Sequence, residues 1–426
     1  MDLIWGAVKG SGTLDYVTCW YKRAADYVSG TAIKTAFVST NSISQGEQAG
    51  ILWEHLFGTY HLKIHFAHRT FSWTSEAKGK AHVHVVIVGF GQQNPLKKRI
   101  YDYTGSSNEA VLVECFNISP YLTEGSDMTL RNRERPISAV PEIVFGCMPN
   151  DDGEFLFTDE ERTAFLKVEP AAEPFFRRFI SSHEFLHGET RWCLWLVDAD
   201  PVLLRKCPHV LTRIEAVRTY RSLSTREATK KLALAPSLFG EIRAPSKRFV
   251  LIPRHSSETR RYIPISYFSP QNIPGDSCLF LENASLYHFG MLMSGIHMAW
   301  VRTVCGRIKS DYRYSNKLVY NNYPWPKSPA DKQSEAVETC AQAVLDVRAK
   351  FPNATFADLY DPLSMPPALA KAHADLDRAV DRCYRAKPFA SDRERVEHLF
   401  ELYEQLTSPL APTAAVVKAK RGRAAR

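Results

Sequence analysis

The first ninety residues alternate between two hydrophobic periods, one typical of helices and one typical of strands. Ser44-Gln-Gly-Glu47 has the pattern of a capping box, which predicts a helix over 44–57. A helical stripe consists of Leu14, Val17, Tyr21, Ala24, Ala25 and Val28, and apolar runs occupy 35–40, 62–66 and 81–90. The helix between the first two runs indicates parallel strands, whereas the last two runs are expected to pair as an antiparallel hairpin. This pattern predicts the closing half of a doubly wound α/β sheet.

The chain then becomes irregular. Residues 91–99 are polar and are expected to form an exit loop, and the following region is rich in proline, arginine and aromatic residues. Apolar periodicity predicts helices at 201–234 and 287–304. Short strands are expected at 110–115, 191–197, 248–253, 262–267 and 277–280. We therefore expect an α/β part at 1–95, followed by a mixed α+β region at 96–326.

The segment Asn321-Asn-Tyr-Pro-Trp-Pro326 ends regular structure, because proline and asparagine at this density favour turns. Helical spacing then returns in three segments, 334–350, 366–385 and 391–406. These helices predict a small all-α domain at 327–406. Residues 407–426 carry no apolar period and are expected to be a disordered basic tail. Its stretch Lys418–Arg423 is either a solvated tail or a weak phosphate-binding segment.

Length and composition narrow the function classes. A chain of 426 residues with 45% hydrophobic residues is long enough for two or three domains. Its net charge of +8 favours a polyanionic partner. Nine cysteines, none in a Cys-x-x-Cys pattern, indicate reduced thiols, and no apolar run has the length of a membrane-spanning helix. We therefore expect a cytoplasmic protein without a membrane segment.

Two histidine patterns raise the question of a metal site. His183-Glu-Phe-Leu-His187 matches the zinc-protease pattern His-Glu-x-x-His, in which Glu184 would act as the general base. Gly188 follows at once, and no third ligand occurs at a recognisable spacing, so a loop before a core strand is the preferred interpretation. His82 and His84 share one strand face and are interpreted as half-buried strand residues. No metal is therefore predicted.

Four segments resemble the methyltransferase domain of MmeI-like enzymes, which are type IIL restriction–modification proteins. They are Gly10–Tyr21, Phe37–Glu47, His68-Arg-Thr-Phe-Ser-Trp73 and Val83–Phe90. The resemblance continues to about residue 405. It implies the end of a Rossmann-like methyltransferase sheet, then a target-recognition domain and a C-terminal helical domain. It also implies methylation of adenine N6 in double-stranded DNA from S-adenosylmethionine.

One departure from this family concerns catalysis. The family's glycine-rich cofactor loop and its Asn-Pro-Pro-aromatic motif lie upstream of the resembling segments, and neither motif occurs in this sequence. We therefore expect the isolated chain to be inactive and to need an upstream-encoded methyltransferase half. A DNA-binding specificity module without chemistry is the alternative. A zinc protease around His183 and Glu184 is a third, weaker hypothesis.

The resemblance also assigns site residues. An enzyme that methylates a base in duplex DNA flips the base out and holds it between apolar faces. Phe71 lies at the position that supplies one face in related enzymes, with Trp73 as second choice. Both residues would otherwise simply pack beneath the loop between their flanking strands.

Basic and aromatic residues suggest where DNA is bound. Arginine and lysine neutralise phosphates or contact guanine, and hydroxyls fix register. The first group of candidates is Arg302, Arg307, Lys309, Tyr312, Arg313, Tyr314 and Ser315. A second group is Lys247, Arg248, Arg254 and Arg260, for which a charged edge strand is the alternative.

Overall fold

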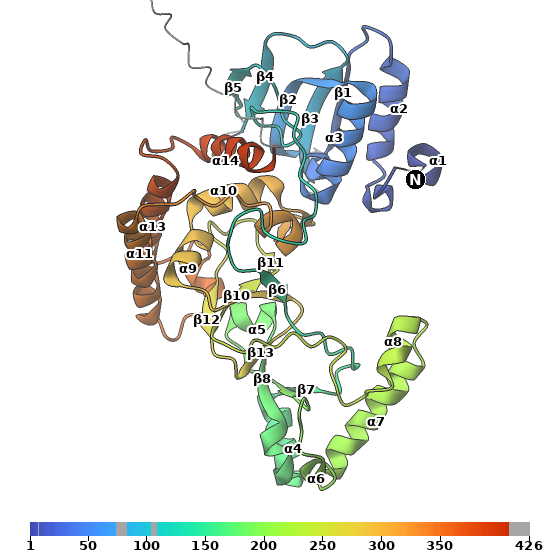
Figure 1. Ribbon diagram of the computed structural model, residues 1–426, viewed down its shortest axis with the longest axis vertical. Coiled ribbons are helices and arrows are strands. Elements are labelled where there is room, and N and C mark those ends of the chain that lie inside the picture. Colours follow the sequence, from blue (N-terminus) through green and yellow to red (C-terminus); the bar gives the residue numbers. More distant parts are fainter. Residues whose placement is uncertain (7, 74–82, 104–108, 409–426) are drawn as a thin grey trace, which may run out of the picture.

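A five-stranded sheet forms one end of an elongated molecule (Figure 1). The computed structural model describes residues 1–6, 8–73, 83–103 and 109–408. In spatial order the strands are β1 (Thr35–Thr40), β3 (Val83–Gly91), β2 (Lys63–Trp73), β4 (Lys98–Asp102) and β5 (Val111–Cys115). β3 is antiparallel to both neighbours, so the expected hairpin of β2 and β3 is confirmed. β1 and β2 run in the same direction but are separated by β3.

Helices cover one face of this sheet. They are α1 (Asp2–Trp5), α2 (Thr18–Val28) and α3 (Gly46–Tyr60), with short 3-10 turns at Ser11–Thr13 and Asn41–Ser44. Tyr21 of α2, Trp53 of α3 and Phe90 of β3 are fully buried and pack their rings together. The predicted capping box is wrong: the Ser44 hydroxyl donates to the Asn41 carbonyl (3.0 Å). Gly46, with φ of +65°, turns the chain into α3 instead.

Two expectations about this region need correction. β2 does not end at Phe66 but continues to Trp73, so Phe71 and Trp73 belong to the strand and pair with Val85 and Val83. The expected exit loop at 91–99 ends in β4, which pairs in parallel with β2. Lys98 of β4 is buried and donates to Asn117, and this distant partner lets a polar segment form a strand.

The central region contains three small sheets. The first has the order β12 (Ser266–Phe268), β10 (Phe249–Pro253), β14 (Cys278–Glu282), β6 (Ile143–Phe145). The second is β11 (His255–Ser256), β16 (Asp311–Arg313), β15 (Arg307–Ile308), and the third is β13 (Asn272–Pro274), β8 (Phe176–Ile180), β9 (Arg191–Leu194), β7 (Leu156–Thr158). The strand expected at 262–267 is reduced to β12. Tyr262 and Ile263 are buried outside any strand, so their apolar character reflects core packing.

The helices of this region are shorter than the sequence predicted. They are α4 (Asp159–Val168), α5 (Ser182–His187), α6 (Pro201–Leu204), α7 (Pro208–Ser222), α8 (Glu227–Leu232), α9 (Leu286–Leu292) and α10 (Gly295–Val304), with Pro170–Phe175 as a 3-10 helix and Asn316–Tyr320 as a π-helix. The helix expected at 201–234 is three helices, because Pro208 cannot continue a helix and starts α7 instead. The helix expected at 287–304 divides at Ser294, whose hydroxyl caps α10.

Four helices follow residue 330 in the described part of the chain, and they pack directly on the central region. They are α11 (Asp331–Ala349), α12 (Phe356–Leu359), α13 (Pro367–Tyr384) and α14 (Asp392–Thr407). Asp377 of α13 accepts hydrogen bonds from the Tyr262 hydroxyl (2.7 Å) and the Gly295 amide (2.6 Å). The ring of Phe400 stacks on Tyr121 at 5.0 Å. Residues 409–426, most of the expected disordered tail, lie outside the described residues.

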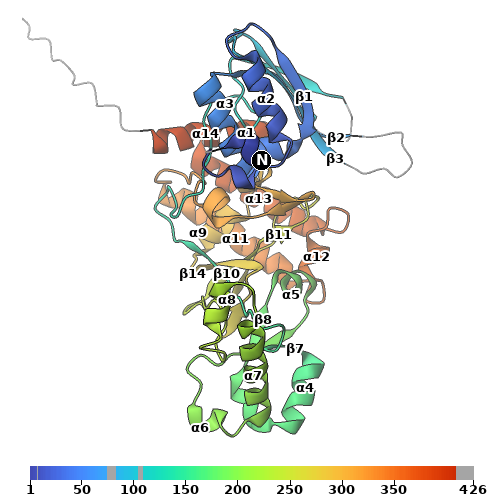
Figure 2. The ribbon, with the colours of Figure 1, turned by 90° about the vertical axis from the view of Figure 1, so that its right-hand side faces the viewer.

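The two ends of the molecule have different cores. One large cluster runs from the N-terminal sheet through α10 to the C-terminal helices. A second cluster fills a lower lobe made by α4, α6, α7 and the sheet of β7, β8, β9 and β13 (Figure 2). β10 and β14 lie between these clusters. Their alternate residues point to opposite faces of the sheet, so one set belongs to the main cluster and the other to a smaller third cluster. The lower lobe is therefore attached through β-structure rather than merged into the main core.

Candidate nucleic-acid interface

The hairpin of β15 and β16 lies against the start of α3. Two cavities, of about 600 Å³ and 280 Å³, open where they meet. Both are lined by Glu47, Gly306, Arg307 and Arg313, and we call them together the interdomain cleft. The larger cavity also contains Asn41 and Ser42, which follow β1. Ligands of open α/β sheets bind outside the carboxyl ends of the strands, and the cleft occupies such a position.

The two walls of the interdomain cleft touch through backbone. A Cβ atom added to Gly46 would lie 3.0 Å from the Cα of Gly306, closer than side chains normally pack. Gly46 also has a left-handed φ of +65°, which favours glycine. The position of the hairpin relative to α3 is therefore set by close contact between two glycines.

Arg307, predicted to contact DNA, joins the two walls. Its guanidinium donates to Gln45 (3.1 Å), to Glu258 (3.1 Å) and to the Ser310 carbonyl (2.8 Å). Its side chain is 14% exposed and lies over the Tyr312 ring at 4.5 Å. His84 of β3 approaches the same Glu258 carboxylate at 3.6 Å. With these partners, Arg307 positions the hairpin and is poorly placed to contact a ligand.

Arg313 and Lys309 provide accessible positive charge in the cleft. Both side chains are exposed, and both line the larger cavity. Within the described ranges, no side-chain hydrogen bond or ion pair engages either of them. Arg254 lies deeper, in the smaller cavity, where burial lowers its pKa and the nearby Arg313 lowers it further. Mutual repulsion of these cations favours the binding of an anion between them.

Three other hairpin candidates have structural contacts. Tyr312 and Tyr314 are buried, and the Tyr314 hydroxyl lies 3.0 Å from Nε2 of His297. Burial raises the pKa of Tyr314 well above its ordinary value. Ser315 caps the following π-helix by accepting from the Leu318 amide (3.2 Å). Of these three, Tyr314 and Ser315 line the smaller cavity of the cleft, whereas Tyr312 lines neither cavity.

The remaining candidates are dispersed. Lys247 and Arg248 precede β10 and lie at the opposite end of that strand from Arg254, roughly 20 Å away at 3.3 Å per residue. Arg248 lies over the Tyr267 ring at 4.0 Å. Arg260 is half-buried near the Ser256 hydroxyl (3.5 Å), and burial lowers its pKa. The second predicted group thus contributes Arg254 to the interdomain cleft.

Phe71 and Trp73 belong to an aromatic cluster at the end of β2. The Phe71 ring stacks on Tyr103 at 4.7 Å, and His68 stacks on Tyr101 at 4.2 Å. Phe71 is half-buried, whereas Trp73 is 46% exposed. Because Tyr103 already covers one face of Phe71, Trp73 has the more accessible ring.

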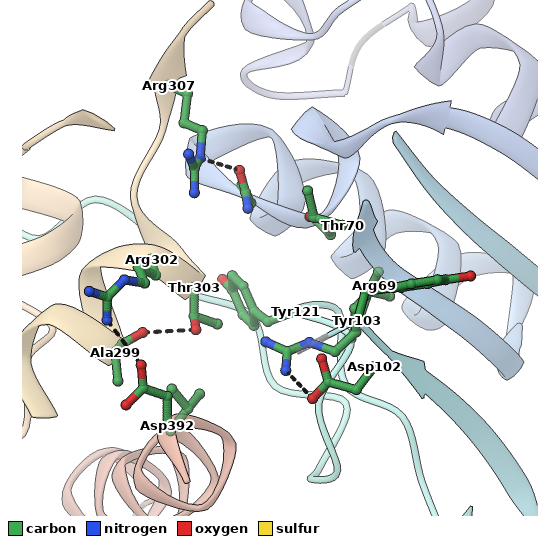
Figure 3. Close-up of a pocket in the computed structure, with 14 residues that line it drawn as sticks. Arg69, Thr70, Asp102, Tyr103, Tyr121, Ala299, Arg302, Thr303, Arg307 and Asp392 are labelled. Carbon is green, nitrogen blue, oxygen red and sulfur yellow. Dashed lines mark hydrogen bonds and ion pairs between the residues drawn. The ribbon is translucent and has the colours of Figure 1, made fainter. Parts of the chain in front are cut away.

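A third cavity, of about 240 Å³, lies between the N-terminal sheet, α10 and α14 (Figure 3). Arg69 pairs with Asp102 at 2.9 Å on the sheet side. Arg302, another predicted DNA contact, pairs with Asp392 at 3.0 Å on the opposite side. Arg307 also lines this cavity and pairs with Glu258, so each of its three arginines has a carboxylate partner. Arg302 therefore holds α14 against α10.

The zinc-protease pattern forms a short helix, α5, rather than the expected loop. Glu184 caps this helix by accepting from the Ser181 amide (3.1 Å), and it also pairs with Arg191 (2.7 Å). These contacts lower the pKa of Glu184 although burial alone would raise it. In the part of the chain that the structure describes, no three histidine, cysteine or acidic residues are grouped to hold a metal ion. Glu184 has a structural role here.

Three family models match the chain in succession. The model described as the DNA-methyltransferase domain of MmeI matches residues 1–102, the MmeI target recognition domain matches 124–327, and the MmeI C-terminal domain matches 329–411. The chain belongs to the MmeI-like family. Its observed architecture, an α/β sheet followed by a mixed region and a helical region, agrees with this assignment.

Two relatives extend the MmeI-like assignment over nearly the whole chain. DNA methyltransferase A of Bacillus subtilis (strain 168) is 42% identical over 404 residues, which are 95% of this chain and 45% of the relative. The type IIL restriction–modification enzyme MmeI, solved in complex with DNA, is 44% identical with a TM-score of 0.86. That match covers 96% of this chain and 54% of MmeI. The chain thus spans about half the length of these relatives.

In this MmeI-like chain the interdomain cleft separates two matched parts. Glu47 lies in the methyltransferase match, and Arg313 lies in the target-recognition match. The cavity of Figure 3 adds α14 from the C-terminal match. No helix within the described ranges combines the length and apolar character needed to cross a membrane.

Sequence reasoning missed several residues of the cleft. Asn41, Ser42 and Gln45 follow a correctly predicted strand, so the rule that ligands bind at carboxyl ends of strands identifies them. Glu258, which pairs with Arg307, lies 49 residues away in the sequence and has no local pattern to mark it. Only the tertiary structure reveals that pair.

Proposed function

We propose that this chain is the target-base and specificity part of a DNA methyltransferase, which transfers a methyl group from S-adenosylmethionine to adenine N6 within a specific sequence. The observation that carries the proposal is the interdomain cleft, where the exposed side chains of Arg313 and Lys309 line the cavity at the carboxyl end of β1. The succession of three MmeI matches supports the same function. MmeI itself was solved in complex with DNA.

Each wall of the cleft has a distinct task. Arg313 and Lys309 bind phosphate or a guanine edge, and Arg254 strengthens the positive field behind them. Arg307 keeps the hairpin in register with α3 through Gln45 and Glu258. A duplex held here lies beside the end of the sheet at which a flipped base would enter.

The flipped adenine stacks on the aromatic cluster of β2. Trp73 offers the more exposed ring, and Phe71 is supported from behind by Tyr103 at 4.7 Å. Aromatic stacking stabilises an extruded base by roughly 1–3 kcal/mol and does not depend on its identity. Recognition of adenine itself then falls to groups outside this cluster.

S-adenosylmethionine supplies the methyl group, but the residues present do not fit it. The sequence contains neither the glycine-rich loop nor the Asn-Pro-Pro-aromatic motif. The cavity at the carboxyl end of β1 is lined by Lys309 and Arg313 on one wall and by Asp15 and Glu47 on the other, and neither missing motif is replaced there. We therefore assign cofactor binding to residues that this sequence does not contain.

A specificity module without chemistry is the second candidate, favoured by the same missing motifs. A methyl-transfer assay with labelled S-adenosylmethionine separates the two. The chain is tested alone and together with a polypeptide carrying the cofactor-binding half of a relative. We expect transfer only with both parts. Transfer by the chain alone would contradict the assignment of cofactor binding, and DNA binding without any transfer would favour the second candidate.

Variants of the chain test the site within this assay. Arg313→Ala is expected to weaken DNA binding about 10- to 100-fold, as for loss of a base or phosphate contact. Arg382→Ala, an exposed arginine on α13, is the matched control and should bind as the parent does. Phe71→Ala and Trp73→Ala should lower methyl transfer while DNA affinity changes little. Equal affinity of the Arg313 and Arg382 variants would remove the interdomain cleft as the DNA site.

A further inference from the structure

Positive charge is concentrated in the lower lobe, far from the interdomain cleft. Residues 201–234, which include α6, α7 and α8 and which we call the basic arm, hold eight basic residues and two acidic ones. The basic residues are Arg205, Lys206, Arg213, Arg218, Arg221, Arg226, Lys230 and Lys231. The whole chain has a net charge of +8, so this short segment supplies most of the excess.

The basic arm is a fixed element. Arg221 of α7 is fully buried and donates five hydrogen bonds to backbone carbonyls. The acceptors are Pro149, Asn150, Leu232, Ala235 and Leu238. Arg221 thereby ties α7 to the end of α8, to the segment after α8 and to the loop before β7. The other basic residues of the arm therefore project from helices whose positions are fixed by these hydrogen bonds.

Half of the arm's cations are free to bind. Arg213, Arg218 and Lys230 pair with Glu154, Glu215 and Glu227, respectively. Arg205, Lys206, Arg226 and Lys231 are exposed, and within the described ranges their side chains have no ion pair or hydrogen bond. The cost of keeping these like charges close is relieved when they bind a polyanion.

The position of the arm suggests which polyanion it meets. In Figures 1 and 2, α8 stands away from the body on the same side as α1 and α2 of the N-terminal region. The interdomain cleft, where DNA is proposed to bind, lies between these two ends of the molecule. α7 is 15 residues long, or roughly 22 Å, which corresponds to about six base-pair steps. The arm is thus long enough to follow the backbone of a duplex.

We propose that the basic arm binds the sugar–phosphate backbone of the DNA outside the recognised sequence. This inference rests on the proposed function. The polar residues of the arm are lysine, arginine, hydroxyl-bearing residues, one histidine and two glutamates, and the arm contains no asparagine or glutamine. Asparagine and glutamine are the side chains that recognise adenine, so this composition suits phosphate contact better than adenine recognition. The arm therefore contributes affinity and salt dependence, while sequence preference comes from the hairpin in the interdomain cleft.

A salt titration of DNA binding tests the arm. The variant carries Arg205→Ala, Lys206→Ala, Arg226→Ala and Lys231→Ala in the full chain. The control carries Lys332→Ala, Lys350→Ala, Lys371→Ala and Arg382→Ala on α11, α13 and their ends, which lie on the other side of the molecule (Figure 1). Fluorescence anisotropy of a long duplex, whose central sequence is first selected from a random library, gives the affinity from 50 to 200 mM salt.

The arm variant is expected to lower the slope of log affinity against log salt by about 3 to 4, since each phosphate contact contributes about 0.9. Its preference for the selected sequence over random DNA should be unchanged. A short duplex that ends at the selected sequence should show a smaller effect. The control set should keep the slope of the parent chain.

The following results would overturn the inference. An unchanged slope would leave the arm a solvated surface, and an equal loss in the control set would indicate a general charge effect. Equal losses on the long and short duplexes would place the contact inside the recognised sequence. If the parent chain binds no DNA at low salt, the proposed function fails together with the arm. Loss of binding by Arg313→Ala with a normal arm variant would reject the arm alone. Thermal unfolding confirms that each variant is folded.

Discussion

Single residues in this chain have roles that residue type alone does not reveal. Arg307, Tyr312 and Tyr314 share the chemistry of DNA ligands, yet Arg307 bridges two regions and both tyrosines are buried. Arg313, which stands between the two tyrosines in the sequence, remains exposed in the interdomain cleft. Alternation along β16 explains the difference, because successive side chains of a strand point to opposite faces.

His297 gives a pH prediction. Burial lowers its pKa from 6.5 to about 3, so it stays neutral in the folded chain and becomes protonated only after unfolding. The unfolded state therefore binds an extra proton below pH 6.5, and stability falls as the pH decreases from 6.5 toward 3. This residue should cost about 1.4 kcal/mol of unfolding free energy per pH unit in that window.

Urea unfolding of the parent and of His297→Gln, between pH 8 and pH 4.5, measures this effect. Glutamine retains a hydrogen-bonding group near the Tyr314 hydroxyl but does not titrate. The variant should lose stability less steeply below pH 6.5, while the buried His373 leaves a residual slope in both proteins. Parallel curves for the two proteins would show that His297 is accessible to protons in the folded state.

At the scale of elements, the contact of α3 with the hairpin of β15 and β16 sets the width of the interdomain cleft. Gly46→Ala places a methyl group 3.0 Å from the Cα of Gly306 and in a left-handed conformation. We expect it to lower the free energy of unfolding by about 1–3 kcal/mol. Displacement of the hairpin should weaken DNA binding roughly five- to tenfold, where tenfold corresponds to 1.4 kcal/mol.

Gly306→Ala is the matched control on the opposite wall. Its added Cβ would lie 3.6 Å from the Cα of Gly46, an ordinary van der Waals distance. Stability and DNA affinity of this variant should remain close to those of the parent chain. If both alanine variants behave alike, the contact between the walls does not determine the geometry of the cleft.

The elements themselves were predictable where the pattern was local. The strand at 35–40 and the C-terminal helices follow directly from hydrophobic periodicity. β4 was missed because Lys98 becomes a strand residue only through its buried contact with Asn117. Likewise Gly46, rather than the Ser44 capping box, starts α3, since the close approach of Gly306 selects that turn. Contacts between residues distant in sequence account for each of these errors.

In the candidate site, too, residue type was predictable from the sequence, whereas contacts between distant residues were not. Arg313, Lys309 and Arg254 were identified from residue type and meet in the cleft as expected of a binding surface. Arg302 and Arg307 were identified by the same reasoning, but their partners Asp392 and Glu258 lie far along the chain. Tertiary structure decides whether an arginine has a carboxylate partner. The sequence alone therefore could not distinguish the paired arginines from the accessible ones.

At the scale of the whole molecule, the cores do not follow the boundaries that the sequence suggested. The main core includes residues of the N-terminal sheet, the central region and the C-terminal helices, from Trp5 to Tyr403. The lower lobe has its own core, which contains Phe155 and Val217. A smaller third cluster lies between these two cores at β10 and β14. We predict that the two larger cores form two units of unfolding, although the sequence pattern divided the chain into three folded parts.

Hydrogen exchange in increasing urea tests this prediction, because each peptide reports its own transition. Phe155→Ala, in the lower lobe, should lower the free energy of that transition by about 3–5 kcal/mol and leave the other unchanged. Leu399→Ala, in α14, should lower the main transition by about 2–5 kcal/mol across both the N-terminal sheet and the C-terminal helices. A single shared transition would show that β10 and β14 couple the two cores fully. Separate transitions would mean that the basic arm unfolds independently of the interdomain cleft, so that the DNA contacts proposed at the two ends are thermodynamically separable.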